Sequence, residues 1–248
     1  MTSRSLVIPL RNEARRVPGL VAALAGWARP GDELLLVDDG SQDGTPAALE
    51  AAAAAAREAH PGLTVRLIRL DPGEGKGAAV RAGMLAARGA LRAFTDADLP
   101  YGLEAVDALF AALEGGAEVA VGARDLNGSE ARGAPPLRRA ASRLFRAWVG
   151  LVAGLGPVRD TQCGVKAFRA ASAERLFGQL ERRDFAFDIE VLALARGLEL
   201  PVVCVPVRQR AQDGSSVRLR REVPRMFLGA LPAARAGARR ARRARGRG

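Results

Sequence analysis

The chain carries the segment Glu33-Leu-Leu-Leu-Val37-Asp38-Asp39-Gly-Ser-Gln-Asp43-Gly-Thr45, and this segment decides the fold. Its apolar first part, closed by turn residues, has the length of a buried strand. Asp43 and Thr45 are suited to cap the alanine-rich helix that follows, because their side-chain oxygens can accept the free N–H groups of its first turn. A strand, a polar turn and a helix in this order form the repeating unit of a parallel α/β sheet.

The same unit recurs on either side of this segment. Apolar runs of four to six residues alternate with longer segments of helical composition. This alternation predicts an α/β fold with a mainly parallel sheet flanked by helices in a single domain. We expect strands at 5–9, 33–37, 64–69, 91–95 and 118–122. We expect helices over about 13–28, 44–59, 76–88 and 102–114.

The composition is that of an ordinary globular protein, with 248 residues of which 48% are apolar and 26% charged. No apolar run reaches the roughly 18 residues of a membrane-spanning helix. The N-terminus lacks a signal-peptide pattern, so we expect a cytoplasmic protein. The chain has two distant cysteines, Cys163 and Cys204, and one histidine, His60. These counts exclude a disulfide framework, a cysteine-based zinc site and histidine-dependent catalysis, and they leave acid, base and metal-ligand roles to Asp and Glu.

The positive charge is concentrated near the C-terminal end. The net charge is +11, and seven arginines but no acid lie in residues 235–248. This pattern predicts a disordered Arg-rich tail after a domain of residues 1–234, with an anionic lipid surface or nucleic acid as candidate partners. Aromatic residues, on which bases would stack, are only 4% of the chain, so we expect no nucleic acid.

A basic amphipathic helix is predicted over 137–152. Its apolar residues recur with the period of a helix, and Arg139, Arg143 and Arg146 fall on the other side. Two placements are open. The helix could pack on the sheet with its arginines in water, or it could lie on a membrane surface with the arginines near lipid phosphates.

Polar residues follow the first, second and fourth predicted strands, at 9–13, 38–39 and 96–98. Ligands of an open parallel sheet bind outside the carboxyl ends of the strands. The adjacent charges of Asp38 and Asp39 need a ligand, a cation or hydrogen-bond donors to offset them, so we expect one of the two to face a bound polar group. Asp96 and Asp98, about 6–7 Å apart along the chain, can share Mg²⁺ or Mn²⁺ with the phosphate oxygens of a nucleotide diphosphate.

The segment Gly73-Glu-Gly-Lys-Gly77 follows the third strand and opens a helix. It is not a P-loop, because Leu70 and Gly77 stand where that motif needs Gly and Ser or Thr. Gly73-x-Gly75-x-x-Ala78 fits the dinucleotide fingerprint formally, but it follows the third strand rather than the first. A flexible turn with a solvated Lys76 is the other interpretation. Lys76 and Lys166 are the chain's only lysines, which points to positions that need a compact ammonium group.

Four motifs in series resemble family 2 glycosyltransferases of GT-A fold over about residues 5–125. They are Val7-Ile-Pro-Leu-Arg-Asn-Glu13, Val37-Asp-Asp-Gly-Ser-Gln-Asp-Gly-Thr45, Gly75-Lys-Gly77 and Asp96-Ala-Asp98. In the second half, Asp160-Thr-Gln-Cys-Gly164 and Phe187-Asp-Ile-Glu190 resemble the polyprenyl-phosphate branch of the family. That branch contains dolichyl-phosphate glucosyltransferases and mannosyltransferases, and the first of these two segments is closer to the glucosyltransferases.

The resemblance implies roles for the matching positions and divides the domain into a nucleotide-binding half, about 1–125, and an acceptor half, about 126–234. Catalytic roles are expected for Asp96, Asp98, Arg124 and Asp188. The base and ribose would be held by Pro9, Arg11, Glu13, Val37 and Asp39. The sugar, diphosphate and metal would be held by Asp96, Ala97 and Asp98, and the phosphates by Arg124. Lys76 is expected among the donor-binding residues, and Arg139 and Ser142 at the lipid phosphate.

The implied activity is inverting transfer of a hexose from a nucleotide-diphosphate sugar to a polyprenyl or dolichyl phosphate, on the cytoplasmic face of a membrane. UDP-glucose is the first expectation for the donor, and GDP-mannose is the alternative. Pro100 stands where mannosyltransferase relatives usually carry Gln, a probable metal contact; this departure favours glucose and leaves one coordination site to water. Eukaryotic glucosyltransferase relatives have a membrane anchor ahead of the catalytic domain, so here lipid access would fall to the basic helix and the tail.

A phosphate acceptor is already ionised at neutral pH and needs no strong base, whereas a hydroxyl acceptor could use Asp188 or Glu190. The alternatives are a soluble acceptor and, more distantly, a non-catalytic protein that binds a nucleotide sugar or nucleic acid.

Overall fold

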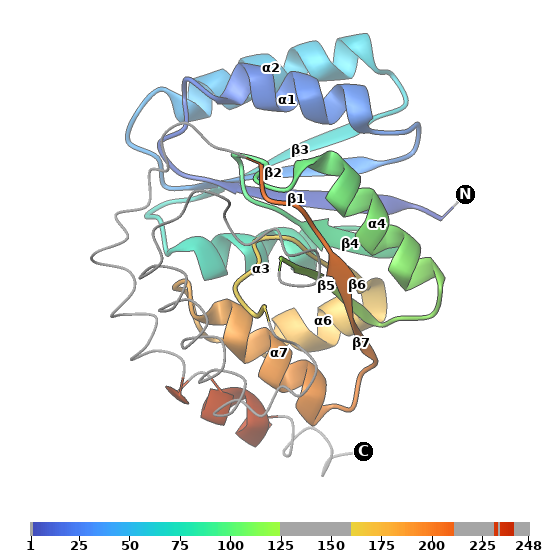
Figure 1. The fold of residues 1–248 in the computed structure, drawn as a ribbon. Helices are drawn as coiled ribbons and strands as arrows, with labels where there is room; N and C mark the ends of the chain where they lie inside the picture. The colour runs from blue at the N-terminus through green and yellow to red at the C-terminus, as the bar shows by residue number, and fades with distance from the viewer. Residues whose placement is uncertain (1, 125–159, 211–230, 233, 241–248) are drawn as a thin grey trace.

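The computed structural model describes residues 2–124, 160–210, 231–232 and 234–240. These residues build one seven-stranded sheet with helices on both faces (Figure 1). The strand order is β3-β2-β1-β4-β6-β5-β7, and only β6 runs antiparallel to its neighbours among these paired strands. The predicted α/β fold with a mainly parallel sheet is confirmed.

The first half of the chain follows the predicted alternation closely. The five predicted strands lie within two residues of β1 (Arg4–Leu10), β2 (Glu33–Asp39), β3 (Thr64–Leu70), β4 (Leu91–Phe94) and β5 (Val119–Ala123). The predicted helices correspond to α1 (Val17–Trp27), α2 (Thr45–Ala59), α3 (Lys76–Ala86) and α4 (Gly102–Glu114). Helix α1 begins four residues later than predicted, because the backbone after Glu13 first forms a turn.

The second half contains elements that the sequence did not predict. Strands β6 (Lys166–Arg169) and β7 (Val202–Pro206) complete the sheet, and helices α6 (Ala170–Gly178) and α7 (Phe187–Gly197) cover it. Residues 234–240 are helical, whereas we expected a disordered tail from residue 235. The rest of that tail, the predicted helix 137–152, Arg139 and Ser142 lie outside the described residues.

Strands β1, β2 and β5 are buried on both faces, which explains their apolar runs, whereas β3 and β7 at the two edges of the sheet are partly exposed. Leu6 and Ile8 of β1 pack in a core with α1, α2 and α4 on one face. Val7, between them, packs in a second core with α3, α6 and α7 on the other face. The same alternation divides Leu34 and Leu36 from Leu35 in β2. Figure 1 shows the two helical layers above and below the sheet.

The strand order places the candidate site. Strand β1 pairs with β2 on one side and with β4 on the other, so the order of the sheet reverses between β1 and β4. In open parallel sheets, ligands bind beside the carboxyl ends of strands at such a reversal. The polar residues that follow β1, β2 and β4 are therefore brought to one edge.

Helix α3 approaches the sheet through Gly83, and an alanine substitution tests this packing. A Cβ atom on Gly83 would lie 2.3 Å from Cγ1 of Val7 and 3.0 Å from Cγ2 of Val37. Both valines are fully buried, so Gly83→Ala is expected to cost about 1–3 kcal/mol of unfolding free energy by overpacking. Gly26→Ala in α1 is the matched control, because nothing lies within 4 Å of its Cβ position. It should stabilise the protein by up to about 1 kcal/mol. Urea denaturation measures both variants, and equal effects would contradict the proposed packing.

Candidate active site

Asp39, the last residue of β2, binds the backbone of the glycine-lysine turn, residues 73–77. Its Oδ1 accepts hydrogen bonds from the backbone N–H groups of Glu74 at 2.7 Å and Gly75 at 2.9 Å. Arg11 lies 3.3 Å from Oδ2 of the same carboxylate. The negative charge of Asp39 is therefore offset by hydrogen-bond donors of the protein itself. These hydrogen bonds join the end of β2 to the start of α3.

The neighbouring charge of Asp38 is also offset within the chain. One oxygen of this buried carboxylate accepts the N–H of Ser41 at 3.2 Å, and the other lies 3.5 Å from Nε of Arg69. The structure provides cations and donors of the chain itself for both acids, although Oδ2 of Asp38 is buried and accepts no hydrogen bond from a described residue. That one of the two acids faces a bound polar group stays a prediction. Asp43 accepts the N–H of Thr45, the first residue of α2, at 2.9 Å, as predicted. Thr45 does not cap the helix: the N-cap position is Gly44, and the Thr45 hydroxyl accepts the N–H of Glu13.

Lys76 lies in the centre of the candidate site. Its Nζ is 2.5 Å from Oδ1 of Asp96, and only 18% of its side chain is exposed. Burial lowers the pKa of Lys76, but the negative charges of Asp96 and Asp188 outweigh this effect and raise the pKa above its ordinary value. Lys76 is thus a paired ammonium group, and the alternative of a solvated lysine in a flexible turn is wrong.

Asp96 and Asp98 follow β4 and reach solvent. Asp98 is exposed, and 31% of the Asp96 side chain is exposed, whereas Ala97 between them is buried. Gly164, to which the sequence analysis gave no role beyond its place in the 160–164 motif, lies directly behind Asp96. A Cβ atom on Gly164 would lie 2.2 Å from Oδ2 of Asp96, so only glycine leaves room for this carboxylate.

The two carboxylates fit a divalent cation that is shared with a bound phosphate. Within the described ranges, no group of three or more His, Cys, Asp or Glu side chains could hold a metal ion by itself. Mg²⁺ is commonly held by one or two carboxylates, with phosphate oxygens and water completing its coordination. Asp96 and Asp98 match this open type of site.

Arg124 is held at the end of β5 by Asp160. Its Nε lies 2.6 Å from Oδ2 and its second terminal nitrogen 2.7 Å from Oδ1 of this fully buried carboxylate. Burial lowers the pKa of Arg124, but the hydrogen bonds and charge of Asp160 outweigh it and keep the guanidinium protonated. Next to Asp160, the Thr161 hydroxyl oxygen and the Gln162 side-chain nitrogen are buried, and neither forms a hydrogen bond with a described residue.

Asp188 lies at the start of α7 and is paired with Lys166. The Lys166 Nζ lies 2.6 Å from Oδ1 of Asp188, and it also donates a hydrogen bond to the Cys163 carbonyl at 2.7 Å. Burial raises the pKa of Asp188, although Lys166 and Lys76 oppose this effect. Only 4% of Asp188 is exposed. This position suits a residue that orients its neighbours, and its catalytic role stays a prediction.

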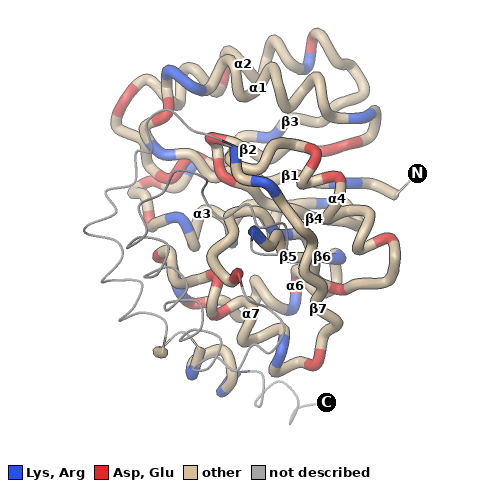
Figure 2. The backbone as a smooth tube through the Cα atoms, in the orientation of Figure 1, with Lys and Arg blue, Asp and Glu red and all other residues tan. Residues whose placement is uncertain are grey.

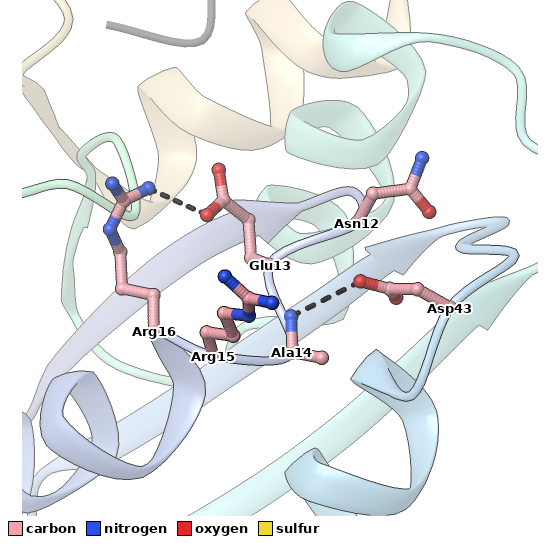
Figure 3. A pocket seen from close by; sticks show the side chains of 6 residues that line it. All are labelled: Asn12, Glu13, Ala14, Arg15, Arg16 and Asp43. Atoms are coloured by element: carbon pink, nitrogen blue, oxygen red, sulfur yellow. Dashed lines mark hydrogen bonds and ion pairs between the residues drawn. The ribbon is translucent and has the colours of Figure 1, made fainter. Parts of the chain in front are cut away.

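The loop after β1 borders a hollow of about 480 Å³ (Figure 3). Glu13 forms an ion pair with Arg16 at 2.6 Å, and its backbone N–H donates to Oγ1 of Thr45 at 2.8 Å. Pro9 lies opposite Val37 in the pairing of β1 with β2, but the Val37 side chain is fully buried against α3. The hollow is lined by Asn12, Glu13, Ala14, Arg15, Arg16 and Asp43.

These features define an α/β protein of the kind that binds a phosphorylated ligand at the carboxyl edge of its sheet. The carboxylates of Asp39, Asp96 and Asp98 lie at the ends of β2 and β4. The cations are Arg124, which follows β5, and Lys76, the first residue of α3. Basic and acidic positions are interspersed along the described backbone (Figure 2).

The sequence matches the model of glycosyl transferase family 2 over residues 5–177, and the chain belongs to this family of glycosyltransferases. The dolichyl-phosphate beta-glucosyltransferase of Drosophila melanogaster is 35% identical, with 86% of this chain and 68% of the relative covered. The human protein of the same name is 28% identical, with 86% and 69% covered. Family membership excludes the dinucleotide-fingerprint interpretation of the glycine-lysine turn.

Solved structures of the same fold include glucosyl-3-phosphoglycerate synthase from Mycobacterium tuberculosis. Its complex with Mn²⁺, UDP and glucosyl-3-phosphoglycerate has a TM-score of 0.71 at 18% identity, with 96% of this chain and 80% of that chain covered. Its complex with Mg²⁺ and UDP has a TM-score of 0.69 at 19% identity, with 96% and 79% covered. The likeness confirms the GT-A fold.

None of the helices in the described ranges combines the length and the hydropathy needed to cross a bilayer.

Cys163 makes the unfolding free energy of the protein depend on pH. Burial raises the pKa of this thiol to about 12, so it stays protonated in the folded protein. The unfolded chain loses this proton above about pH 8.5, and unfolding then becomes easier by up to about 1.4 kcal/mol per pH unit. Cys163→Ala lacks this contribution, so its unfolding free energy should decline less steeply from pH 8.5 to 10.5 in urea denaturation. A pH-independent difference between the two proteins would contradict the assignment.

Proposed function

We propose that this glycosyltransferase transfers glucose from UDP-glucose to a polyprenyl phosphate, with inversion at the anomeric carbon. The observation that carries the proposal is the 35% identity to a dolichyl-phosphate beta-glucosyltransferase across 86% of the chain. At 86% of the chain, this relationship must include parts of both the proposed nucleotide-binding half and the proposed acceptor half. The solved neighbours with UDP and Mn²⁺ or Mg²⁺ share the fold and support a nucleotide donor with a divalent cation.

On the donor side, Asp96 and Asp98 would hold Mg²⁺ or Mn²⁺ against the diphosphate. The cation would neutralise the charge that develops on the leaving nucleotide diphosphate. Lys76, at the start of α3, and Arg124 would contact the phosphate oxygens, because both ammonium and guanidinium groups bind phosphate. The proposed donor contacts are completed by Pro9, Arg11, Glu13, Asp39 and Ala97. Val37, whose side chain is buried against α3, would contribute only through its backbone.

On the acceptor side, the lipid phosphate would displace the diphosphate directly. A phosphate oxygen forms the new bond to the anomeric carbon while the bond to the diphosphate oxygen breaks. The acceptor is already ionised, so the protein's tasks are alignment and charge neutralisation. Two observations agree with a reaction that needs no general base. Asp188 is buried and paired with Lys166, and His60 is exposed at the end of α2.

We assign Arg139 and Ser142 to the lipid phosphate. The chain would reach the cytoplasmic membrane face through the segments 137–152 and 235–248. GDP-mannose as donor and a soluble acceptor are the alternatives that the following experiment separates.

Asp98→Ala tests the metal-dependent donor site. The unmodified protein should bind UDP-glucose in a Mn²⁺-dependent manner in isothermal titration and transfer glucose to polyprenyl phosphate in liposomes. Asp98→Ala removes one carboxylate ligand, so we expect at least a 100-fold loss of transfer, about 3 kcal/mol in the activation barrier. Glu58→Ala, on the exposed side of α2, removes a carboxylate far from the site and should change neither value.

The outcomes are distinct. Mn²⁺-dependent binding of GDP-mannose alone would replace the donor, and transfer to a soluble acceptor alone would replace the lipid. Full transfer by Asp98→Ala would contradict the metal role.

Gly164→Ala tests the position of Asp96 without removing a charge. A methyl group would occupy the place of the Asp96 carboxylate, so metal-dependent UDP-glucose binding should weaken about tenfold or more, equivalent to about 1.4 kcal/mol. Gly178→Ala is the control, because nothing lies within 4 Å of its Cβ position at the end of α6. Titration calorimetry compares both variants after their melting temperatures are measured. Unchanged binding by Gly164→Ala would show that Asp96 does not need its present position.

A further inference from the structure

We propose that Arg240 is a positioning residue for Lys76. It would act through Glu190 on the support loop, residues 181–185, which lies against the glycine-lysine turn. The relevance of this connection to catalysis rests on the proposed function, but the connection itself can be tested without activity. Four sets of contacts carry the inference, from the C-terminal helix (residues 234–240) to Asp96.

The C-terminal helix is packed tightly on α7. Figure 1 shows this helix, coloured red, beside α7. Gly237 is buried, and a Cβ atom there would lie 2.8 Å from Cβ of Ala193 and 2.9 Å from the carbonyl oxygen of Glu190. Ala234, one turn earlier, is also buried, with 4% exposed. Small residues on one face thus let the two backbones approach closely and fix where Arg240 lies.

Arg240 forms an ion pair with Glu190 in the interior. The Glu190 side chain is 0% exposed, and one of its oxygens is paired with Arg240. Arg240 also pairs with the exposed Glu181 at the start of the support loop. A buried carboxylate requires a cation and hydrogen-bond donors, so Glu190 depends on Arg240.

The second oxygen of Glu190 holds the support loop. It accepts the backbone N–H of Arg182 at 2.8 Å. The next residue, Arg183, accepts the N–H of Gly77 through its carbonyl oxygen at 2.8 Å, and its side chain lies 2.5 Å from Glu74. The support loop is therefore bound to α7 on one side and to the glycine-lysine turn on the other.

The contact between loop and turn leaves no spare room. A Cβ atom on Gly75 would lie 2.5 Å from the Arg183 carbonyl oxygen, and one on Gly77 would lie 2.7 Å from that of Arg182. Lys76, between these glycines, places its Nζ 5.6 Å from the centre of the Phe185 ring. A displaced support loop would therefore displace Lys76 and its pairing with Asp96.

Amide hydrogen exchange on the full chain tests the connection. Arg240→Ala leaves Glu190 buried without its cation, so exchange should become at least fivefold faster in peptides covering 73–80 and 181–186. Peptides of β1 and β2 should be unchanged. Arg240→Lys keeps a positive charge and should restore most of the protection. Arg239→Ala removes an exposed arginine of the same helix and should match the unmodified protein.

A double variant separates positioning from general destabilisation. Glu190→Gln combined with Arg240→Ala removes the buried charge that Arg240→Ala leaves behind, and it should recover slow exchange at Gly77. In the activity arm, Arg240→Ala should weaken UDP-glucose binding severalfold, with recovery in the double variant.

Unchanged exchange at 73–80 in Arg240→Ala would overturn the proposal, as would equal acceleration in every region or no recovery in the double variant. If the unmodified protein binds no UDP-glucose, the proposed function fails, whereas the exchange results still decide the role of Arg240.

Discussion

The carboxylate of Asp39 is the constraint on which the candidate site depends. It stands at the end of the buried strand β2 and accepts the N–H groups of Glu74 and Gly75 at 2.7 and 2.9 Å. These bonds fix the turn from which α3 begins, and Lys76 is the first residue of α3. The position of Lys76 then determines that its ammonium group meets Asp96, which follows β4 on the far side of β1. Through Lys76, the Asp39 side chain thus connects the ends of β2, β3 and β4, which are distant in sequence.

The first half of the fold could be predicted because its signals are local. Each strand is an apolar run between turn residues, and each helix follows within a few positions. The second half lacks such signals. Strand β6 has only four residues, begins with the charged Lys166 and runs antiparallel, so neither its composition nor the alternation of units indicates it. Its lysine is tolerated in the interior because Asp188, 22 positions later, neutralises it.

The candidate site was predicted to a similar extent, and for the same reason. Motifs at strand ends identified Asp39, Asp96 and Lys76, because the carboxyl ends of parallel strands must meet at one edge. The sequence could not indicate what each residue contacts. Asp39 binds backbone N–H groups of the turn, and the room for Asp96 depends on Gly164, which comes from a segment 68 positions further along the chain. A glycine whose task is to leave space has no signal in composition or periodicity.

Buried ion pairs between residues distant in sequence hold together the part of the structure that follows β5. Asp160 holds Arg124, Asp188 holds Lys166, and Glu190 is paired with Arg240. Each of these carboxylates is at most 4% exposed, so the pairs contribute little net stability after desolvation but are costly to break. Their value is orientation. An anionic diphosphate and an anionic acceptor can approach each other only if cations are already in place between them, and a cation whose partner is rigid does not reorganise when the ligand arrives. Under the proposed function, Arg124, held by the buried carboxylate of Asp160, would be such a cation for a reaction between two negatively charged substrates. Ion pairs between residues so distant in sequence leave no signal in the local sequence, although they fix where the charges lie.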